Sequence, residues 1–212
     1  MTSAVTGGGT TTLRVTAGAS AGAQAFRSTV QRIGPELATR MTASYRAGCP
    51  VPLTDLRYLT VTIRGFDGRS HQGELVVSAR VAADVVTVFK TLYDKGFPIR
   101  SMRLVDDFGA DDDASMAADN SSAFNCRPVT GGSSWSEHSY GEAIDINPRE
   151  NPYLSGDTVL PPDGAGYVDR PDSPGVIHSG DAVVSAFAAI GWHWGGNWTD
   201  PVDLQHFSRS GR

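Results

Sequence analysis

Two short segments of this sequence hold residue types that can bind a metal ion and move a proton. The first contains His138 and Asp145, and the second contains Asp203 and His206. A catalytic zinc site uses three nitrogen or oxygen ligands from the protein and keeps one position open for water. His138, Asp145 and His206 can supply these three ligands, so we expect them to bind Zn²⁺.

The spacing within each segment favours such a site. Gly141 lets the chain turn between His138 and Asp145, so that Asp145 can point back from a strand. Asp203 precedes His206 by three positions, and on one helical or 3₁₀ turn this spacing places both side chains on the same face. A carboxylate beside a metal ligand can accept a proton from the attacking water, and we therefore expect Asp203 to be the catalytic base.

Each of these pieces also has an ordinary structural explanation. A single His–Asp pair is more often a structural hydrogen bond than a metal site, and an Asp-x-x-His pair is common on surfaces. The other histidines are expected to lie outside the ligand set. His71 falls near a hairpin tip, His178 in a loop, and His193 between two tryptophans, where a fourth protein ligand would close the site to water.

The order of the motifs resembles a known family. Ser-x-His-x-x-Gly-x-Ala-x-Asp, then a tryptophan- and glycine-rich stretch, then Asp-x-x-His-Phe is similar to the zinc metallopeptidases that comprise D-alanyl-D-alanine carboxypeptidases and L-alanyl-D-glutamate peptidases. The resemblance covers residues 97–207 well and extends more loosely over residues 51–96. The matching positions are Ser136, His138, Gly141, Ala143, Asp145, residues 191–198, Asp203, His206 and Phe207.

The resemblance implies a fold and an activity. The fold would be α+β, of the hedgehog/DD-peptidase type, with a small antiparallel sheet carrying the ligands in a groove and helices flanking it. The activity would be zinc-dependent hydrolysis of peptidoglycan stem peptides, most simply as a D-alanyl-D-alanine carboxypeptidase. An L-alanyl-D-glutamate endopeptidase and a non-catalytic zinc-binding cell-wall module are the alternatives.

The family also uses an arginine to polarise the scissile carbonyl. Arg127, shortly before the Ser-x-His motif, matches that arginine, and Arg103, at the end of another predicted strand, is the competing candidate. A guanidinium suits the role because negative charge develops on the carbonyl oxygen. Four residues near the motifs are expected to contact substrate, although both tryptophans would fit a core equally well: Ser136, Tyr140, Trp194 and Trp198.

The first half of the chain predicts a helix, a hairpin and a second helix. Apolar spacing favours a helix over residues 24–46, broken or kinked at Pro35. Residues 59–63 and 73–77 alternate and predict a β-hairpin. Ser78 is the predicted N-cap of a helix whose apolar positions run from Val81 to Leu92 and which stops at Gly96 and Pro98.

The second half predicts short strands separated by loops. Strands are expected over residues 99–105, 122–127 and 143–146, and a solvated acidic loop over residues 106–113. Residues 147–180 are rich in proline and glycine and read as a long ordered loop or a lid. A last helix is expected from Ser179 or Asp181 to Gly191.

Composition places the chain among ordinary globular proteins. With 212 residues, 40% hydrophobic residues and a net charge of -5, it can bury a core, and it lacks the basic stripe of a nucleic-acid-binding protein. No apolar run approaches the ~18–20 residues of a membrane span. We expect a flexible arm over residues 1–24, a single zinc peptidase domain over residues 25–212 with its core motifs in 97–207, and a monomer.

The two cysteines bear on the compartment. Cys49 and Cys126 form no Cys-x-x-Cys pair, so a cysteine zinc site is not expected. Each lies beside a proline-bearing loop, which favours a disulfide over two buried thiols. The start of the chain lacks the basic and apolar regions of a signal peptide, yet a peptidoglycan substrate implies an extracytoplasmic location.

Overall fold

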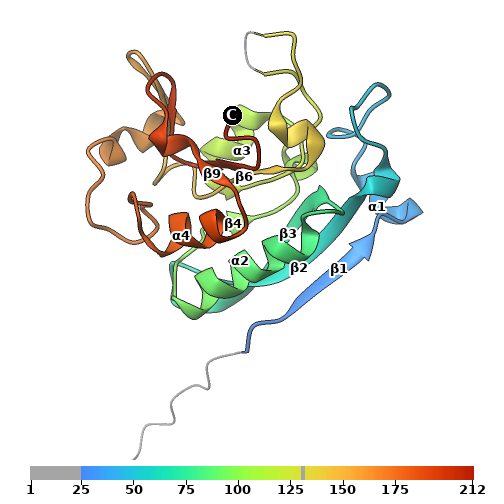
Figure 1. The fold of residues 1–212 in the computed structure, drawn as a ribbon, viewed down its shortest axis with the longest axis horizontal. Coiled ribbons are helices and arrows are strands. Elements are labelled where there is room, and N and C mark those ends of the chain that lie inside the picture. The colour runs from blue at the N-terminus through green and yellow to red at the C-terminus, as the bar shows by residue number, and fades with distance from the viewer. Residues whose placement is uncertain (1–24, 130–131) are drawn as a thin grey trace, which may run out of the picture.

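The computed structural model describes residues 25–129 and 132–212 (Figure 1). Among these residues the strands form three sheets of three strands and one pair of strands, accompanied by short helices. Small, mostly antiparallel sheets with few helices agree with the predicted α+β class. The predicted arm over residues 1–24 lies outside the described residues.

The first sheet has the order β1–β2–β3. Strands β2 (Leu56–Arg64) and β3 (Ser70–Ser78) pair antiparallel along their whole length, which confirms the predicted hairpin. Strand β1 (Ser28–Arg32) pairs with the other edge of β2. The first half of the predicted helix over residues 24–46 is therefore wrong, because pairing with β2 outweighs the loose helical spacing.

Pro35 begins a helix instead of breaking one. Helix α1 (Pro35–Arg40) has proline in its first turn, where the missing N–H has no intrahelical partner to lose. A short 3₁₀ turn, η1 (Leu53–Asp55), then leads into β2.

The two longest helices lie side by side (Figure 1). Helix α2 (Ala82–Asp94) packs on β2 and buries the predicted apolar face, including Val85, Phe89 and Leu92. Its N-cap is Val81, so the prediction of Ser78 is wrong; the N–H of Ser78, at the end of β3, donates to the carbonyl of Gly141 over 2.8 Å. Helix α4 (Ala182–Ala189) is capped by Asp181, as predicted.

Two further sheets carry the motif residues. Strands β6 (Ala143–Asp145), β11 (His206–Ser208) and β9 (His193–Trp194) form an antiparallel sheet in the order β6–β11–β9. Strands β10 (Val202–Asp203), β7 (Tyr153–Ser155) and β8 (Thr158–Leu160) form the other. The expected loop over residues 147–180 thus contains two strands and the 3₁₀ segment η4 (Pro162–Tyr167).

The middle of the chain is less regular than predicted. Of the two strands expected over residues 99–105 and 122–127, the structure has only β4 (Ser101–Met102), which pairs in parallel with β5 (Asn120–Ser121). Between them lie η2 (Val105–Phe108) and α3 (Asp112–Ala117). Two more short 3₁₀ helices, η3 (Glu137–Tyr140) and η5 (Gly195–Asn197), lie near the motifs.

The acidic segment over residues 106–113 exposes Asp107, Asp111 and Asp113 to solvent as expected, but it is part of η2 and α3 and is not a plain loop. Asp106 accepts hydrogen bonds from the backbone of Ala43 and Ser44, and Asp111 caps α3. These carboxylates occupy fixed structural positions because each finds backbone donors that would otherwise be unpaired.

Two buried apolar clusters hold the elements together. The larger joins β2, β3, α2, α4 and the β6–β11–β9 sheet. The smaller includes Met41, Phe124 and Cys126. The predicted disulfide between Cys49 and Cys126 is confirmed, with the two Cα atoms 5.8 Å apart, and it ties the loop after α1 to the smaller cluster. In the described part of the chain, no helix has the length and apolar character needed to cross a bilayer.

Candidate metal centre

His138, Asp145 and His206 come together as predicted. The Nε2 atom of His138 lies 3.2 Å from Oδ2 of Asp145, and Nδ1 of His206 lies 3.0 Å from Oδ1. One ligand atom from each residue lies within 4.8 Å of the other two. Bonds of about 2.1 Å in a tetrahedron place ligand atoms about 3.4 Å apart, so this donor set fits a zinc ion with small adjustments.

Sheet register places two of the ligands. Asp145 on β6 stands directly opposite His206 on β11. His138 comes from η3, whose N-cap Ser136 accepts a hydrogen bond from the His138 N–H over 3.3 Å. Gly141 ends η3 in the left-handed region, with φ of 68°. A Cβ there would lie 2.6 Å from the backbone nitrogen of Ser78, so the turn into β6 requires glycine.

Backbone carbonyls orient both imidazole rings. The carbonyl of Ala123 lies 2.6 Å from Nδ1 of His138, and that of Arg212 lies 3.0 Å from Nε2 of His206. A carbonyl can only accept, so these nitrogens carry the ring protons. The other nitrogen of each ring faces Asp145. A metal ion bound there would displace any proton on that nitrogen and leave the tautomer that a metal ligand needs.

Charge within the cluster suits a cation. Burial favours the protonated form of Asp145, but the charge of His138 and hydrogen bonds from both histidines hold its pKa well below the ordinary value. Burial alone would lower the pKa of His206. The hydrogen bond and the charge of Asp145, together with the charge of Asp203, instead raise that pKa to about 9 in the absence of metal. Without metal, the proton on His206 offsets the negative charge of Asp145, and a bound metal cation would take the place of that proton.

Asp203 lies beside this cluster but reaches it differently from the prediction. It is on β10, paired with Tyr153, whereas His206 is on β11. The predicted helical or 3₁₀ turn is therefore wrong, because the two residues belong to different sheets. Desolvation by burial is the largest cause that raises the Asp203 pKa to about 7; His206 lowers it and Asp145 raises it. Within the described residues, its enclosed Oδ1 atom has no hydrogen-bond partner, as expected of a carboxylate that serves a water or ligand.

Arg127 and Arg103 occupy different surroundings. The Arg127 guanidinium contacts the carboxylate of Asp112, and the charges of His138 and Asp145 act on that same carboxyl group. Arg103 instead pairs with Asp107 and lies over the ring of Phe108, both of which belong to η2. Arg127 is therefore the arginine near the metal cluster, and its role in polarising a carbonyl stays a prediction.

Comparison with known proteins identifies the segment that carries the cluster. Residues 130–209 match the family of D-alanyl-D-alanine carboxypeptidases. The expected resemblance to these zinc metallopeptidases is thereby confirmed over this segment. No curated protein and no solved structure matches the chain.

The peptidase motifs did not reveal several residues that support the site. Asp112 was read as part of a solvated loop, yet it contacts Arg127 and accepts a hydrogen bond from Nδ2 of Asn125 over 2.7 Å. Ala123 and Arg212 contact the histidines through backbone carbonyls. Every residue has such a group, so the residue type gives no signal of this role. For Asp112, the density of acids before Arg127 was the one available signal.

The predicted substrate-binding residues lie at different depths. Ser136 is buried as a cap, and Tyr140 at the end of η3 is half-buried. Trp194 is in the core, with Nε1 donating to the carbonyl of Leu204 over 2.8 Å. The ring of Trp198 is 5.4 Å from that of His206, between centroids. Their contacts with substrate stay predictions.

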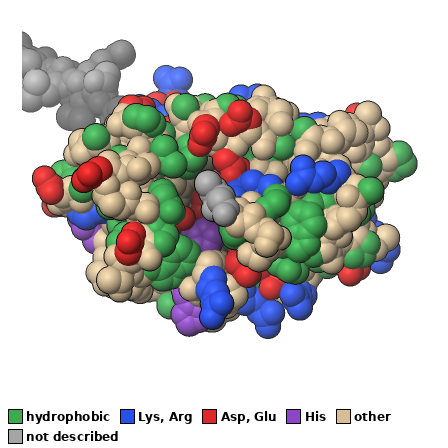
Figure 2. Space-filling model, turned by 90° about the horizontal axis from the view of Figure 1, so that it is seen from above, with side chains coloured by type: hydrophobic (Ala, Val, Ile, Leu, Met, Phe, Trp, Pro, Cys, Tyr) green, Lys and Arg blue, Asp and Glu red, His purple; other side chains and the backbone are tan. Residues whose placement is uncertain are grey.

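A pocket of about 290 Å³ opens next to Trp198. Figure 2 shows one face of the molecule, on which histidine and acidic side chains lie in a hollow bordered by apolar and basic side chains. The residues that line the 290 Å³ pocket next to Trp198 combine indole rings with small polar groups: His193, Trp194, Asn197, Trp198, Ser210 and Gly211.

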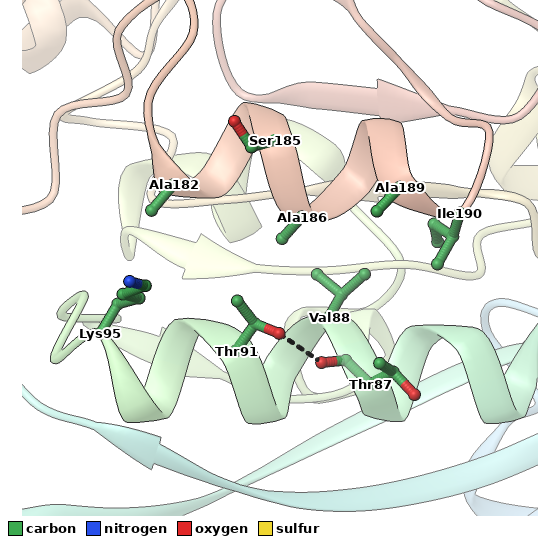
Figure 3. Close-up of a pocket in the computed structure, with 9 residues that line it drawn as sticks. All are labelled: Thr87, Val88, Thr91, Lys95, Ala182, Ser185, Ala186, Ala189 and Ile190. Atoms are coloured by element: carbon green, nitrogen blue, oxygen red, sulfur yellow. Dashed lines mark hydrogen bonds between the residues drawn. The ribbon is translucent and has the colours of Figure 1, made fainter.

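A second hollow, of about 420 Å³, lies between α2 and α4 (Figure 3). Its lining is mostly apolar, with Val88 and Ile190 among small alanines, and Thr87, Thr91, Ser185 and Lys95 add polar groups. The Thr91 hydroxyl donates to the carbonyl of Thr87 within its own helix. None of the motif residues of the peptidase family lines it, so it is separate from the candidate metal centre.

Proposed function

We propose that this chain is a zinc-dependent peptidase that hydrolyses peptidoglycan stem peptides, most simply by removing the terminal residue of D-alanyl-D-alanine ends. The observation that carries the proposal is a cluster of three ligands beside the enclosed Asp203 carboxylate, whose Oδ1 has no partner among the described residues. The family matched by residues 130–209 supports both the reaction and the substrate class.

The residues divide the chemistry between them. His138, Asp145 and His206 would hold zinc, which when bound acts as a Lewis acid on a carbonyl and on water. Asp203 takes a proton from the attacking water and then delivers it to the leaving amine. Arg127 would stabilise the negative charge that develops on the carbonyl oxygen. The water oxygen forms a bond to the carbonyl carbon, and the C–N bond of the peptide breaks. The proton that Asp203 takes from the water ends on the leaving amine.

The fold and location belong to the same proposal. The ligand-bearing antiparallel sheet with helices beside it fits the hedgehog/DD-peptidase type. The disulfide supports an oxidising, extracytoplasmic compartment, since such bonds persist there and are rare in the cytosol. A monomer is the simplest working state.

Two measurements on the purified protein test the function. Elemental analysis should find one zinc per chain, and purified muropeptides should lose one alanine each when their masses are measured after digestion. Cleavage between L-alanine and D-glutamate would instead assign the endopeptidase alternative. The His138→Ala variant should lose zinc and activity, whereas His178→Ala, outside the cluster, should keep both. Absence of zinc together with intact muropeptides would end the proposal.

A further inference from the structure

We propose that the segment Ser208–Arg212 positions the metal ligand His206, with the backbone carbonyl of Arg212 fixing the orientation and tautomer of the ring. The inference rests on the proposed metal site and assigns a role to residues that follow the Asp-x-x-His-Phe motif. It concerns binding of the metal, and its test therefore does not depend on catalytic turnover.

The contact with His206 is specific in its chemistry. The Arg212 carbonyl lies 3.0 Å from Nε2 of His206, and the hydroxyl of Ser208 donates to the same carbonyl oxygen over 2.7 Å. Ser208 is fully buried in β11. The oxygen uses two acceptor positions, one for the ring and one for the hydroxyl that holds it. With its proton fixed on Nε2, His206 presents Nδ1 toward Asp145.

Other contacts hold this segment in place. The Arg209 N–H donates to the carbonyl of Glu142 over 3.1 Å, and its guanidinium lies 3.5 Å from the Glu142 carboxylate. The indole N–H of Trp198 donates to the carbonyl of Gly211 over 3.0 Å. These partners lie in separate parts of the chain, so the Arg212 carbonyl is supported from several sides. Figure 1 shows the chain ending close to the sheet of β6 and β9.

The same segment also borders the 290 Å³ pocket. Ser210 and Gly211 line that pocket together with Trp198, whose ring packs near His206. The ring of His206 is therefore held at its edge by the Arg212 carbonyl and flanked by Trp198. Loss of an outer partner of a metal-binding histidine typically lowers metal affinity by about 10–100-fold, and we expect a loss of that size here.

The experiment compares two changes at the same place. A chain ended after Ser210 removes the Arg212 carbonyl, and Arg212→Ala keeps the carbonyl but removes the side chain. Zinc dissociation constants are measured by competition with a chromogenic chelator, and the visible spectrum is recorded with cobalt in place of zinc. The shortened chain should bind zinc about 10–100-fold more weakly and show a changed cobalt spectrum, while Arg212→Ala should match the unaltered protein.

Circular dichroism of the metal-free proteins separates positioning from folding. If the shortened chain fails to fold without metal, Ser208→Ala decides, since it removes only the hydroxyl that holds the carbonyl. Wild-type zinc affinity in Ser208→Ala, or in a folded shortened chain, would overturn the inference, as would an equal loss in Arg212→Ala. A protein that binds zinc tightly but cleaves no muropeptide would count against the proposed function alone.

Discussion

Asp145 and Asp203 are two carboxylates in one site with different environments. Asp145 is hydrogen-bonded to both histidines and its pKa is depressed, whereas burial raises the pKa of Asp203 to about 7. A permanently ionised carboxylate suits a metal ligand, and one that titrates near neutrality suits a proton carrier. In the proposed mechanism, environment more than residue type therefore suits Asp145 to the role of ligand and Asp203 to the role of base.

The Asp203→Asn variant tests this division. The amide keeps the shape of the side chain but cannot accept a proton, so zinc content should be unchanged and hydrolysis of muropeptides should fall by about 10²–10⁴-fold. Turnover and bound zinc are measured on the same preparation. Loss of zinc with activity would make Asp203 a ligand, and near-normal turnover would refute its role as the base.

The buried carboxylate of Asp119, outside the peptidase motifs, predicts a pH dependence of stability. Burial, followed by the negative charge of Glu150, raises the Asp119 pKa to about 7. Because the folded state holds this proton more tightly than the unfolded state, the stabilisation is full below about pH 4 and is lost as the pH rises toward 7. Asp119 has a φ of 53°, which asparagine tolerates.

The Asp119→Asn variant should remove that loss. Relative to the unaltered protein, it should gain stability between pH 5 and pH 8, by on the order of 1–3 kcal/mol. Urea unfolding at both pH values gives the difference directly, and metal effects common to both proteins cancel. Asp157→Asn is the control, since Asp157 is exposed in the turn between β7 and β8. A difference that is the same at both pH values would contradict the assignment.

At the scale of elements, regular patterns predicted regular structure. The hairpin of β2 and β3 and the helices α2 and α4 were predictable because each buries one apolar face over several turns or residue pairs. Strand β1 was not, because its five residues are all exposed and only their pairing with β2 makes them a strand. The short strands around the motifs likewise depend on partners distant in sequence.

The candidate metal ligands were predictable as a cluster for a different reason. Their residue types and spacing are set by coordination chemistry, so they appear in the sequence as a motif. Their supports act through long-range contacts, such as Ala123 with His138 and Asp112 with Arg127. The relation of Asp203 to His206 was wrong in its geometry because a spacing of three fits a helical turn as well as two strands of different sheets.

Gly141 links two of these elements and offers a sharp test. In Gly141→Ala the new Cβ would meet the backbone of Ser78 at 2.6 Å, with φ at 68°. We expect a loss of about 2–4 kcal/mol in the free energy of unfolding and weaker zinc binding, because His138 must move with η3. Gly180→Ala is the matched control: its φ is 76°, but nothing lies within 4 Å of the added Cβ. It should cost about 1 kcal/mol and leave zinc binding intact.

Urea unfolding and zinc titration of both variants give the answer. Equal losses in the two variants would mean that the backbone conformation alone matters at position 141. The close approach of η3 to β3 would then have no part in holding His138.

On the scale of the whole molecule, metal should stabilise a fold that already exists. The larger core cluster joins the β1–β2–β3 sheet, the β6–β11–β9 sheet and helices α2 and α4, and it includes none of the three candidate ligands. Removing metal with a chelator should therefore leave the far-ultraviolet circular dichroism spectrum unchanged. The free energy of unfolding should fall by an amount that grows with the zinc previously present, about 3 kcal/mol at a hundred times the dissociation constant, and the melting temperature should fall with it. Collapse of the spectrum on chelation would show that the metal is needed for folding.

The pairing of Asp145 with His206 has a kinetic consequence. The ladder between β6 and β11 sets these residues face to face, and the Ala123 carbonyl holds the ring of His138. All three candidate ligands are therefore in place in the metal-free chain before it captures an ion. Zinc uptake should then be a simple encounter, with an observed rate that rises in proportion to ion concentration and reaches no plateau. In a stopped-flow experiment with a fluorescent metal indicator, a plateau would reveal a slow conformational step that gates entry.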